Sequence, residues 1–196
     1  MTDTPSLSPR ARKPAQILAA ARRLFLAQGY AGTSMDAVAA AAPVSKRTLY
    51  QHFPSKEALF GAVVLQVWQG LTAEDAAPRG DEPRQALRDY SHRLMAHWDN
   101  PDVIGFLRLI MAEGPSSPEM TAAYYARGKA PAVAALAAYL RPLAAAGRLS
   151  TGDAELAAVQ FLGMIKEALF WPRVLGVPTG FSPETVVEAA IDRILT

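Results

Sequence analysis

Apolar side chains recur every three to four residues along most of the chain, which is the spacing of one face of an α-helix. A clear example is the segment 14–28, whose apolar stripe ends before Gly29, a residue suited to a helix C-cap. The stripe consists of Ile17, Leu18, Ala21, Leu24 and Phe25. β-branched residues are sparse and no alternating run exceeds a few residues, so the pattern predicts an all-α fold without strands.

Glycine and proline residues divide the chain into about nine predicted helices. These helices cover approximately residues 14–28, 33–41, 46–52, 56–76, 84–99, 102–113, 119–146, 153–176 and 183–195. Pro131, Pro142 and Pro172 fall inside these ranges. Because proline removes a backbone donor and clashes with the preceding turn, we expect kinks or breaks at these three positions.

The second and third helices are short and closely spaced. Thr33 and Asp36 have the spacing of a capping box, which places the start of the second helix at Thr33. Pro43 ends that helix, because the residue before a proline is driven out of the α region. Ser45 then caps the third helix. Three helices with a turn of about three residues between the last two indicate a helix-turn-helix.

The third helix has little apolar surface for its length. Leu49 is its main core residue, and Val44 and Phe53 flank it as anchors. Its other side chains are those of Lys46, Arg47, Thr48, Tyr50, Gln51 and His52. Such a row of hydrogen-bond donors fits the major groove of DNA, which admits an α-helix and offers phosphates and base edges.

The charge distribution along the chain favours a polyanionic partner for the first third. Residues 1–60 hold eight basic and three acidic side chains, a net charge of +5, whereas residues 61–196 hold 12 basic and 15 acidic side chains, a net charge of −3. A basic head on an acidic body is typical of proteins that bind nucleic acid, although ordinary charge scatter gives the same numbers.

Composition narrows the class of protein. No apolar run reaches the roughly 18 residues of a membrane span, and the polar N-terminus has no signal-peptide pattern. The chain has no cysteine, which excludes disulfides and thiolate metal sites and is consistent with a cytoplasmic protein.

Signatures of catalysis and metal binding are absent from the sequence. It contains no G-x-S-x-G, H-E-x-x-H or phosphate-binding G-x-x-x-x-G-K motif, and its acidic residues are scattered singly. His92 and His97 would stand about 140° apart on one helix, a poor arrangement for a shared metal. We therefore expect neither an enzyme nor a cofactor.

The predicted helix-turn-helix closely resembles the DNA-binding head of the TetR family of bacterial regulators. The resemblance runs from about Ile17 to Phe60. It is carried by Thr33-Ser34-Met35-Asp36-Ala37-Val38-Ala39 and by Val44-Ser45-Lys46-Arg47-Thr48-Leu49-Tyr50-Gln51-His52-Phe53-Pro54-Ser55-Lys56-Glu57-Ala58-Leu59. It implies an all-helical homodimer with two domains, usually a repressor that a small molecule releases from its DNA operator.

The resemblance also implies the DNA contacts. It places Thr33 or Ser34 near a phosphate, and it places four residues on the groove-facing start of the recognition helix. These four are Ser45, Lys46, Arg47 and Thr48. Tyr50, His52 and Lys56 match residues that hold the sugar-phosphate backbone. Arg47 is the expected base reader, because a guanidinium can bind guanine O6 and N7 together.

Pro43 departs from the family pattern, which has glycine in the turn. Glycine supplies a positive φ there, whereas the proline ring fixes φ near −65°. We therefore expect this turn to close differently.

The rest of the chain resembles, more loosely, the AefR-like branch of the family's ligand-binding and dimerisation domain. The similar stretches are 105–113, 124–125, 136–149 and 156–163. Large apolar residues with some polar handles are together the candidate effector pocket, although for each one alone packing in a helical core is the better interpretation. The candidates are Trp68, Met95, Trp98, Phe106, Ile110, Tyr124, Met164 and Trp171, with Phe170 beside them. A mostly apolar, neutral or weakly charged effector is expected.

The last two helices carry surplus apolar side chains, which the resemblance assigns to the dimer interface and which could equally pack within one subunit. The candidates are Val159, Leu162, Val187, Ile191 and Ile194, with Val186 and Ala190 nearby.

The resulting domain prediction is a flexible basic arm (1–12), a DNA-binding domain (13–56) and a ligand-binding and dimerisation domain (57–196). Arg10 and Arg12 in the arm, with Lys13 directly after it, could add DNA contacts or none. Two other classes stay open, a helical protein-interaction module and a small helical enzyme, neither of which would bind DNA.

Overall fold

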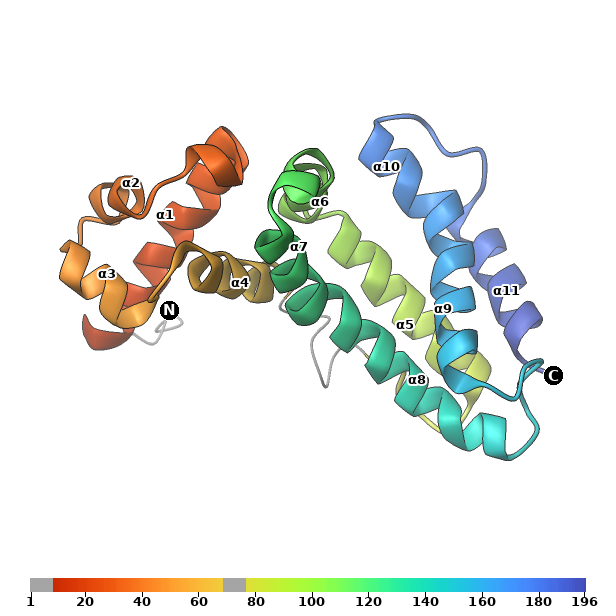
Figure 1. The fold of residues 1–196 in the computed structure, drawn as a ribbon. Coiled ribbons are helices and arrows are strands. Elements are labelled where there is room, and N and C mark those ends of the chain that lie inside the picture. The colour runs from red at the N-terminus through yellow and green to blue at the C-terminus, as the bar shows by residue number, and fades with distance from the viewer. Residues whose placement is uncertain (1–8, 69–76) are drawn as a thin grey trace, which may run out of the picture. The chain divides into compact units, whose positions relative to one another are not determined.

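The computed structural model describes residues 9–68 and 77–196, and these residues form an all-helical fold (Figure 1). The first helices are α1 (Pro9–Gly32), α2 (Met35–Ala41), α3 (Lys46–His52), α4 (Lys56–Val67), α5 (Pro83–Trp98) and α6 (Pro101–Glu113). A short 3-10 turn, η1 (Gly114–Ser116), precedes α7 (Pro118–Tyr124), η2 (Tyr125–Lys129) and α8 (Ala130–Ala145). The last elements are α9 (Ala154–Ile165), η3 (Lys166–Phe170), α10 (Trp171–Leu175) and α11 (Pro183–Ile194).

A π-helical turn joins α7 to α8 and another joins α9 to α10, so that each pair forms one continuous helix, as the sequence predicts. η2 joins α7 to α8 just before Pro131, and η3 joins α9 to α10 just before Pro172. With each pair counted as one continuous helix, the described residues form nine helices, as predicted. The wider turn accommodates a proline, which cannot donate to the carbonyl four residues earlier. For Pro172 that carbonyl belongs to Ala168, and it accepts a hydrogen bond from Thr179 Oγ1 at 2.8 Å.

Pro142, in contrast, does not break its helix. It lies inside α8, which continues through it to Ala145. Of the three prolines at which a kink or break was expected, Pro131 and Pro172 follow a change of helix type, whereas Pro142 does not.

The chain forms two compact units that differ from the predicted division at residues 56 and 57. Of the described residues, the first unit contains 9–66 and 109–124, and the second contains 67–68, 77–108 and 125–196. Most of α4 and the end of α6 therefore belong to the unit that carries the helix-turn-helix. The predicted continuation of α4 to residue 76 lies mostly outside the described residues.

The core of the first unit is built around three aromatic rings. Phe25 stacks on Tyr30 with ring centres 5.8 Å apart, and Phe60 meets each of them edge-on at 5.2 Å. These contacts join the end of α1 to α4. Leu49, fully buried on α3, adds the recognition helix to the same unit.

The helix boundaries of the first unit differ from the predicted ones at two places. α1 begins at Pro9, so the expected flexible arm is helical from there on, while residues 1–8 lie outside the described residues. The N-cap of α2 is Ser34, not Thr33, since Ser34 Oγ accepts a hydrogen bond from Ala37 N at 3.1 Å. The predicted partner of the capping box, Asp36, instead binds Lys46.

The turn between α2 and α3 keeps a left-handed backbone despite its proline. Pro43 has a φ of 21°, far from the value near −65° that its ring favours. Val44 N donates to Ala39 O at 3.1 Å, which is the longer bond of a Schellman motif, a motif that usually has glycine at the Pro43 position. The expectation that the turn closes differently is wrong, and the cost is backbone strain.

The second unit is a bundle in which α5, α8, α9 and α11 pack along one another (Figure 1). Its core consists of fully buried side chains from all four helices. They include Leu87, Tyr90, Leu136, Leu140, Phe161, Ile165 and Ile191. Arg84 and Arg88 of α5 form ion pairs with Glu188 of α11, which fixes the register of these two helices. In the described part of the chain no helix is long and apolar enough to cross a membrane.

Candidate nucleic-acid interface

The recognition helix α3 presents polar side chains to solvent, as the sequence predicts. Ser45 caps it, with Oγ accepting a hydrogen bond from Thr48 N at 3.1 Å. Leu49 is its only buried residue. The exposed side chains are those of Lys46, Arg47, Tyr50, Gln51 and His52. This helix of two turns thus buries one residue in the core and exposes most of the others to a partner.

Arg47 and Lys46 differ in how available they are. Arg47 makes no hydrogen bond or ion pair with any residue that the structure describes. Lys46 Nζ lies 2.6 Å from Asp36 Oδ2, and this hydrogen bond raises the pKa of Lys46. Both partners are more than 60% exposed, so the pair is weak and can exchange for a phosphate.

The start of α2 offers Ser34, not Thr33, to a partner. Ser34 is exposed. Thr33 is only 1% exposed, and its hydroxyl donates to the Gly29 carbonyl oxygen at 2.7 Å. Of the two residues that the resemblance implied, Thr33 therefore has a structural role in the turn between α1 and α2.

Lys56 is tied into that same turn. Its ammonium group donates to the carbonyl oxygens of Tyr30 (2.8 Å) and Thr33 (3.1 Å), and it lies 4.3 Å from the centre of the Tyr30 ring. Two of its three N–H bonds are thus used within the protein. One donor and the positive charge are left at the first turn of α4.

Glu113, which the sequence analysis did not single out, holds the other side of the turn. Its carboxylate accepts hydrogen bonds from Tyr30 N (3.2 Å) and Ala31 N (2.7 Å). These amides are free because Gly29 has a non-helical backbone with a φ of 79°. A Cβ at Gly29 would lie 2.1 Å from Glu113 Oε1. Glycine is therefore required there both by the positive φ and by the close approach of the carboxylate. Nothing local in the sequence links Glu113 to a turn 82 residues away.

The residues expected to form an effector pocket are distributed over both units. Ile110 and Tyr124 lie in the first unit, and the other six lie in the second. Burial raises the pKa of Tyr124 to about 12. Within the second unit Trp98 packs on Phe170 with ring centres 4.8 Å apart, and Phe170 packs on Trp171 at 5.9 Å. The second unit thus has an aromatic cluster where α5 meets η3.

Polar side chains also reach the interior of the second unit. Burial lowers the pKa of His97 to about 4, and its ring lies 5.5 Å from that of Trp68. Lys166 follows α9 in a largely buried position. Among the described residues no group of three or more potential metal ligands gathers.

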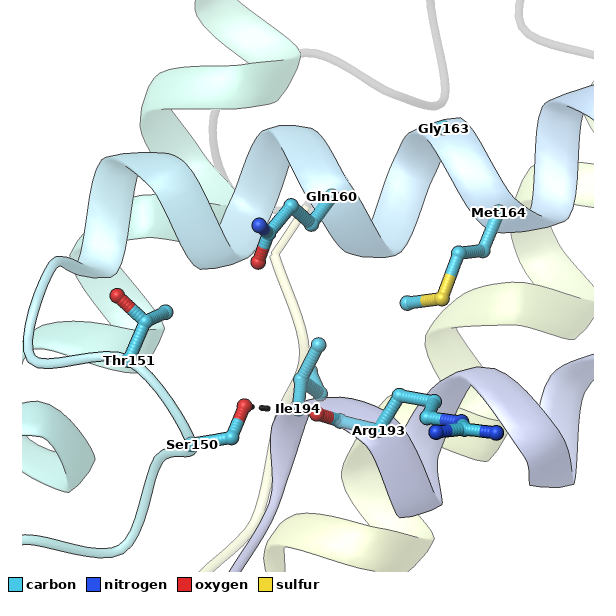
Figure 2. Close-up of a pocket in the computed structure, with 7 residues that line it drawn as sticks. All are labelled: Ser150, Thr151, Gln160, Gly163, Met164, Arg193 and Ile194. Atoms are coloured by element: carbon cyan, nitrogen blue, oxygen red, sulfur yellow. Dashed lines mark hydrogen bonds between the residues drawn. The ribbon is translucent and has the colours of Figure 1, made fainter.

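The outer side of α9 and α11 carries a groove of about 610 Å³ (Figure 2). It is lined by Ser150, Thr151, Gln160, Gly163, Met164, Arg193 and Ile194. Ser150 Oγ donates to the Arg193 carbonyl oxygen at 2.7 Å, which closes one end of the groove. Met164, expected in an effector pocket, points into this surface groove (Figure 2).

Most residues expected at a dimer interface are buried within the single chain. Leu162, Val187, Ile191 and Ile194 are at most 5% exposed, because they pack α9 and α11 onto the bundle. They leave almost no surface for a partner. Val159 is 55% exposed, and Leu156 beside it is 45% exposed. The apolar surface of α9 available to a second subunit is therefore centred on these two residues.

Two family models match the chain. The model described as "Bacterial regulatory proteins, tetR family" matches residues 17–63, and the one described as "AefR-like transcriptional repressor, C-terminal domain" matches residues 85–196. Together they cover the helix-turn-helix and nearly all of the second unit.

Curated relatives are similar over part of their length. The HTH-type transcriptional regulator UidR of Escherichia coli (strain K12) is 36% identical over 112 residues, which are 55% of this chain and 54% of UidR. The HTH-type transcriptional activator FasR of Mycolicibacterium smegmatis is 46% identical over 82 residues, 41% of this chain and 37% of FasR. The chain thus spans about half the length of the curated relatives it matches, or less.

Solved structures match over nearly the whole chain. A TetR-family transcriptional regulator from Mesorhizobium loti has a TM-score of 0.76 and 29% identity, with 97% of this chain and 100% of that chain covered. The Flavonoid-responsive Regulator FrrA has a TM-score of 0.75 and 34% identity, with 93% of both chains covered.

Proposed function

Because the chain belongs to the TetR family of bacterial regulatory proteins, we propose that it is a transcriptional regulator that binds a palindromic DNA operator as a homodimer. The observation that carries this proposal is the exposed polar face of α3, which has only Leu49 in the core. We further propose that it is a repressor, since the model matching residues 85–196 is that of a repressor's C-terminal domain.

In this proposal α3 lies in the major groove and Arg47 reads a base. Its guanidinium is exposed and has no partner among the residues that the structure describes, so none of their contacts is lost when it binds guanine O6 and N7. Ser45 and Thr48 flank it at the start of α3. Lys46 exchanges its ion pair with Asp36 for one with a phosphate. This contact positions the protein on the DNA but does not distinguish one base sequence from another.

The remaining DNA contacts hold the backbone. Ser34 at the start of α2, Tyr50 and His52 on α3, and the free donor of Lys56 supply hydrogen bonds to phosphates. Thr33 contributes by fixing the turn from which Ser34 projects.

Homodimerisation brings two recognition helices to successive major grooves, roughly 34 Å apart. The exposed apolar surface of α9 around Leu156 and Val159, next to the groove of Figure 2, is the proposed contact with the second subunit. Gly163 supports a close approach here, since apart from its own helix backbone and its two chain neighbours no described atom lies within 4 Å of where its Cβ would be.

A small, mostly apolar effector is proposed to release the repressor from DNA. The aromatic cluster of Trp98, Phe170 and Trp171 supplies an apolar surface for it. Similarity over 93% of the chain to a regulator named flavonoid-responsive supports an aromatic effector. Such a ligand can act only through a difference in its affinity for the DNA-binding and the released states.

Selection from a library of random DNA duplexes tests the proposal. The purified protein should enrich an inverted repeat whose half-sites are about one helical turn apart. Arg47→Ala should lose the preference at one position in each half-site, whereas Gln51→Ala serves as a control on the same helix. Recovery of no common sequence would instead favour a helical protein-interaction module.

A further inference from the structure

A lysine directly follows the apolar end of α9. Lys166 is the first residue of η3, and its neighbours Ile165, Leu169 and Phe170 are at most 6% exposed. No described residue accepts a hydrogen bond from its ammonium group or forms an ion pair with it. Burial lowers the pKa of Lys166 to about 8, and the positive charge of Lys129 acts in the same direction.

Such an arrangement is costly for the protein alone. Largely buried lysines are normally paired with a carboxylate or a carbonyl oxygen, because the charged form loses its hydration. The charge that acts together with burial on the pKa of Lys166 is that of another cation, Lys129. The interior of the second unit therefore has positive charge without a counter-charge among the described residues.

A second group of unpaired polar atoms lies on α5. Tyr90 Oη, Arg93 Nε and His97 Nε2 are buried and have no hydrogen-bond partner. Their spacing of three and four residues places them on one face of the helix. Interiors rarely leave such atoms unsatisfied, so three along one face indicate a surface that receives a polar ligand.

The two groups belong to neighbouring elements. Trp98, the last residue of α5, packs on Phe170, the last residue of η3, at 4.8 Å between ring centres. Asp99 and Arg173 add an ion pair at 3.5 Å at the same place. The end of α5, where His97 precedes Trp98, is therefore held against η3, the turn that begins with Lys166.

We propose that the effector carries one anionic oxygen group, a carboxylate or an ionised phenol, that accepts a hydrogen bond from Lys166. The apolar part of the effector lies against the aromatic rings of Trp98 and Phe170, and its other polar atoms meet the unpaired atoms of α5, with the Arg93 guanidinium keeping its hydrogen bond to Ala77 O. This inference rests on the proposed function and sharpens it, since the sequence alone led us to expect a neutral or weakly charged effector.

Two dyes with one scaffold test this directly. 8-Anilinonaphthalene-1-sulfonate is an aromatic anion, and N-phenyl-1-naphthylamine is the same molecule without the sulfonate. The wild-type protein should bind the anion more tightly by fluorescence titration. Lys166→Met should lower the affinity for the anion by about tenfold or more. The affinity for the neutral dye should stay the same or rise.

Lys129→Met is the matched control, because it removes an exposed cation near the same site. It should change the affinity for the anion by less than about threefold. The melting temperature gives an independent readout: Lys166→Met should raise it, since it removes an unpaired charge from the interior. A fall in melting temperature, or anion binding that is absent in wild type or unaffected by Lys166→Met, would overturn the proposal.

Two further pairs of ligands separate the possible anions. 2-Naphthoic acid is compared with its methyl ester, and 7-hydroxyflavone with 7-methoxyflavone, in the wild type and in Lys166→Met. In each pair we compare the preference of the protein for the ionisable ligand over its methylated form. If Lys166→Met reduces this preference more for the naphthoic acid pair, the anionic group is a carboxylate; if it does so more for the flavone pair, the group is a phenolate. DNA binding without ligand is measured on the same variant. If Lys166→Met still binds DNA but does not change the affinity for any of these ligands, this inference fails and the proposed function stands.

Discussion

The ammonium group of Lys56 lies 4.3 Å from the centre of the Tyr30 ring and donates a hydrogen bond to the carbonyl oxygen of the same residue at 2.8 Å. One side chain thus joins the first turn of α4 to the end of α1. The same residue matches a phosphate contact of the TetR family, so its structural role and its proposed DNA role coincide.

Lys56→Met should affect both stability and DNA binding. Loss of two charge-assisted hydrogen bonds and of the contact with Tyr30 should lower the free energy of unfolding by about 1–3 kcal/mol. The slope that relates DNA affinity to salt concentration should become shallower by about two, because a dimer loses one phosphate contact in each subunit. Thermal unfolding and binding at several salt concentrations measure the two effects. A change in the salt dependence with no change in stability would contradict the structural role.

Glu113→Ala should destabilise the turn between α1 and α2. The substitution leaves the amides of Tyr30 and Ala31 without their acceptor, and loss of such a cap costs about 1–2 kcal/mol. Glu119→Ala, at an exposed position of α7 in the same unit, is the control and should change stability by less than about 0.5 kcal/mol. Equal effects of the two substitutions in urea denaturation would refute the capping role.

Pro43→Gly should stabilise the protein. Glycine adopts the positive φ without strain and restores a backbone donor, which together outweigh its greater freedom in the unfolded chain. We expect a gain of about 1 kcal/mol in the free energy of unfolding. Pro43→Ala, which restores the donor but keeps a Cβ, should gain less. A loss of stability in Pro43→Gly would mean that the turn is not strained.

Buried His97 should make stability depend on pH. Its pKa falls from 6.5 in the unfolded chain to about 4 in the folded one, so between these values the unfolded state binds more protons. The stabilising effect of neutral His97 is complete above pH 6.5 and is lost as the pH falls towards 4. His97→Gln should flatten this part of the stability curve, whereas His92→Gln, at an exposed position, should not. Parallel curves for wild type and His97→Gln would contradict the prediction.

The fold was predictable where local signals agree. Ser45, Leu49 and Pro54 gave the bounds of α3, because a cap, a core residue and a breaker follow one another within ten residues. The start of α2 was placed one residue early, because Thr33 and Ser34 are equally good caps in sequence. Tertiary packing decides between them, since it buries Thr33 against the Gly29 carbonyl.

The site was less predictable where distant residues meet. Glu113 reaches a turn 82 residues away, and no local pattern announces it. Leu162 and Ile191 have the apolar character of an interface, but the sequence cannot distinguish packing within one subunit from packing between two. Lys166 had a visible signal in the sequence, since it is a cation directly after the apolar run of α9.

The dependence of DNA affinity on salt tests the central claim most directly. Lys46 and Lys56 supply two phosphate-binding cations in each subunit, so a dimer on a DNA duplex should neutralise about four phosphates. We therefore expect a slope of about −4 when the logarithm of the association constant is plotted against that of the salt concentration. Fluorescence anisotropy with a duplex long enough for both half-sites measures it. A slope near zero would contradict the account of this protein as a DNA-binding regulator.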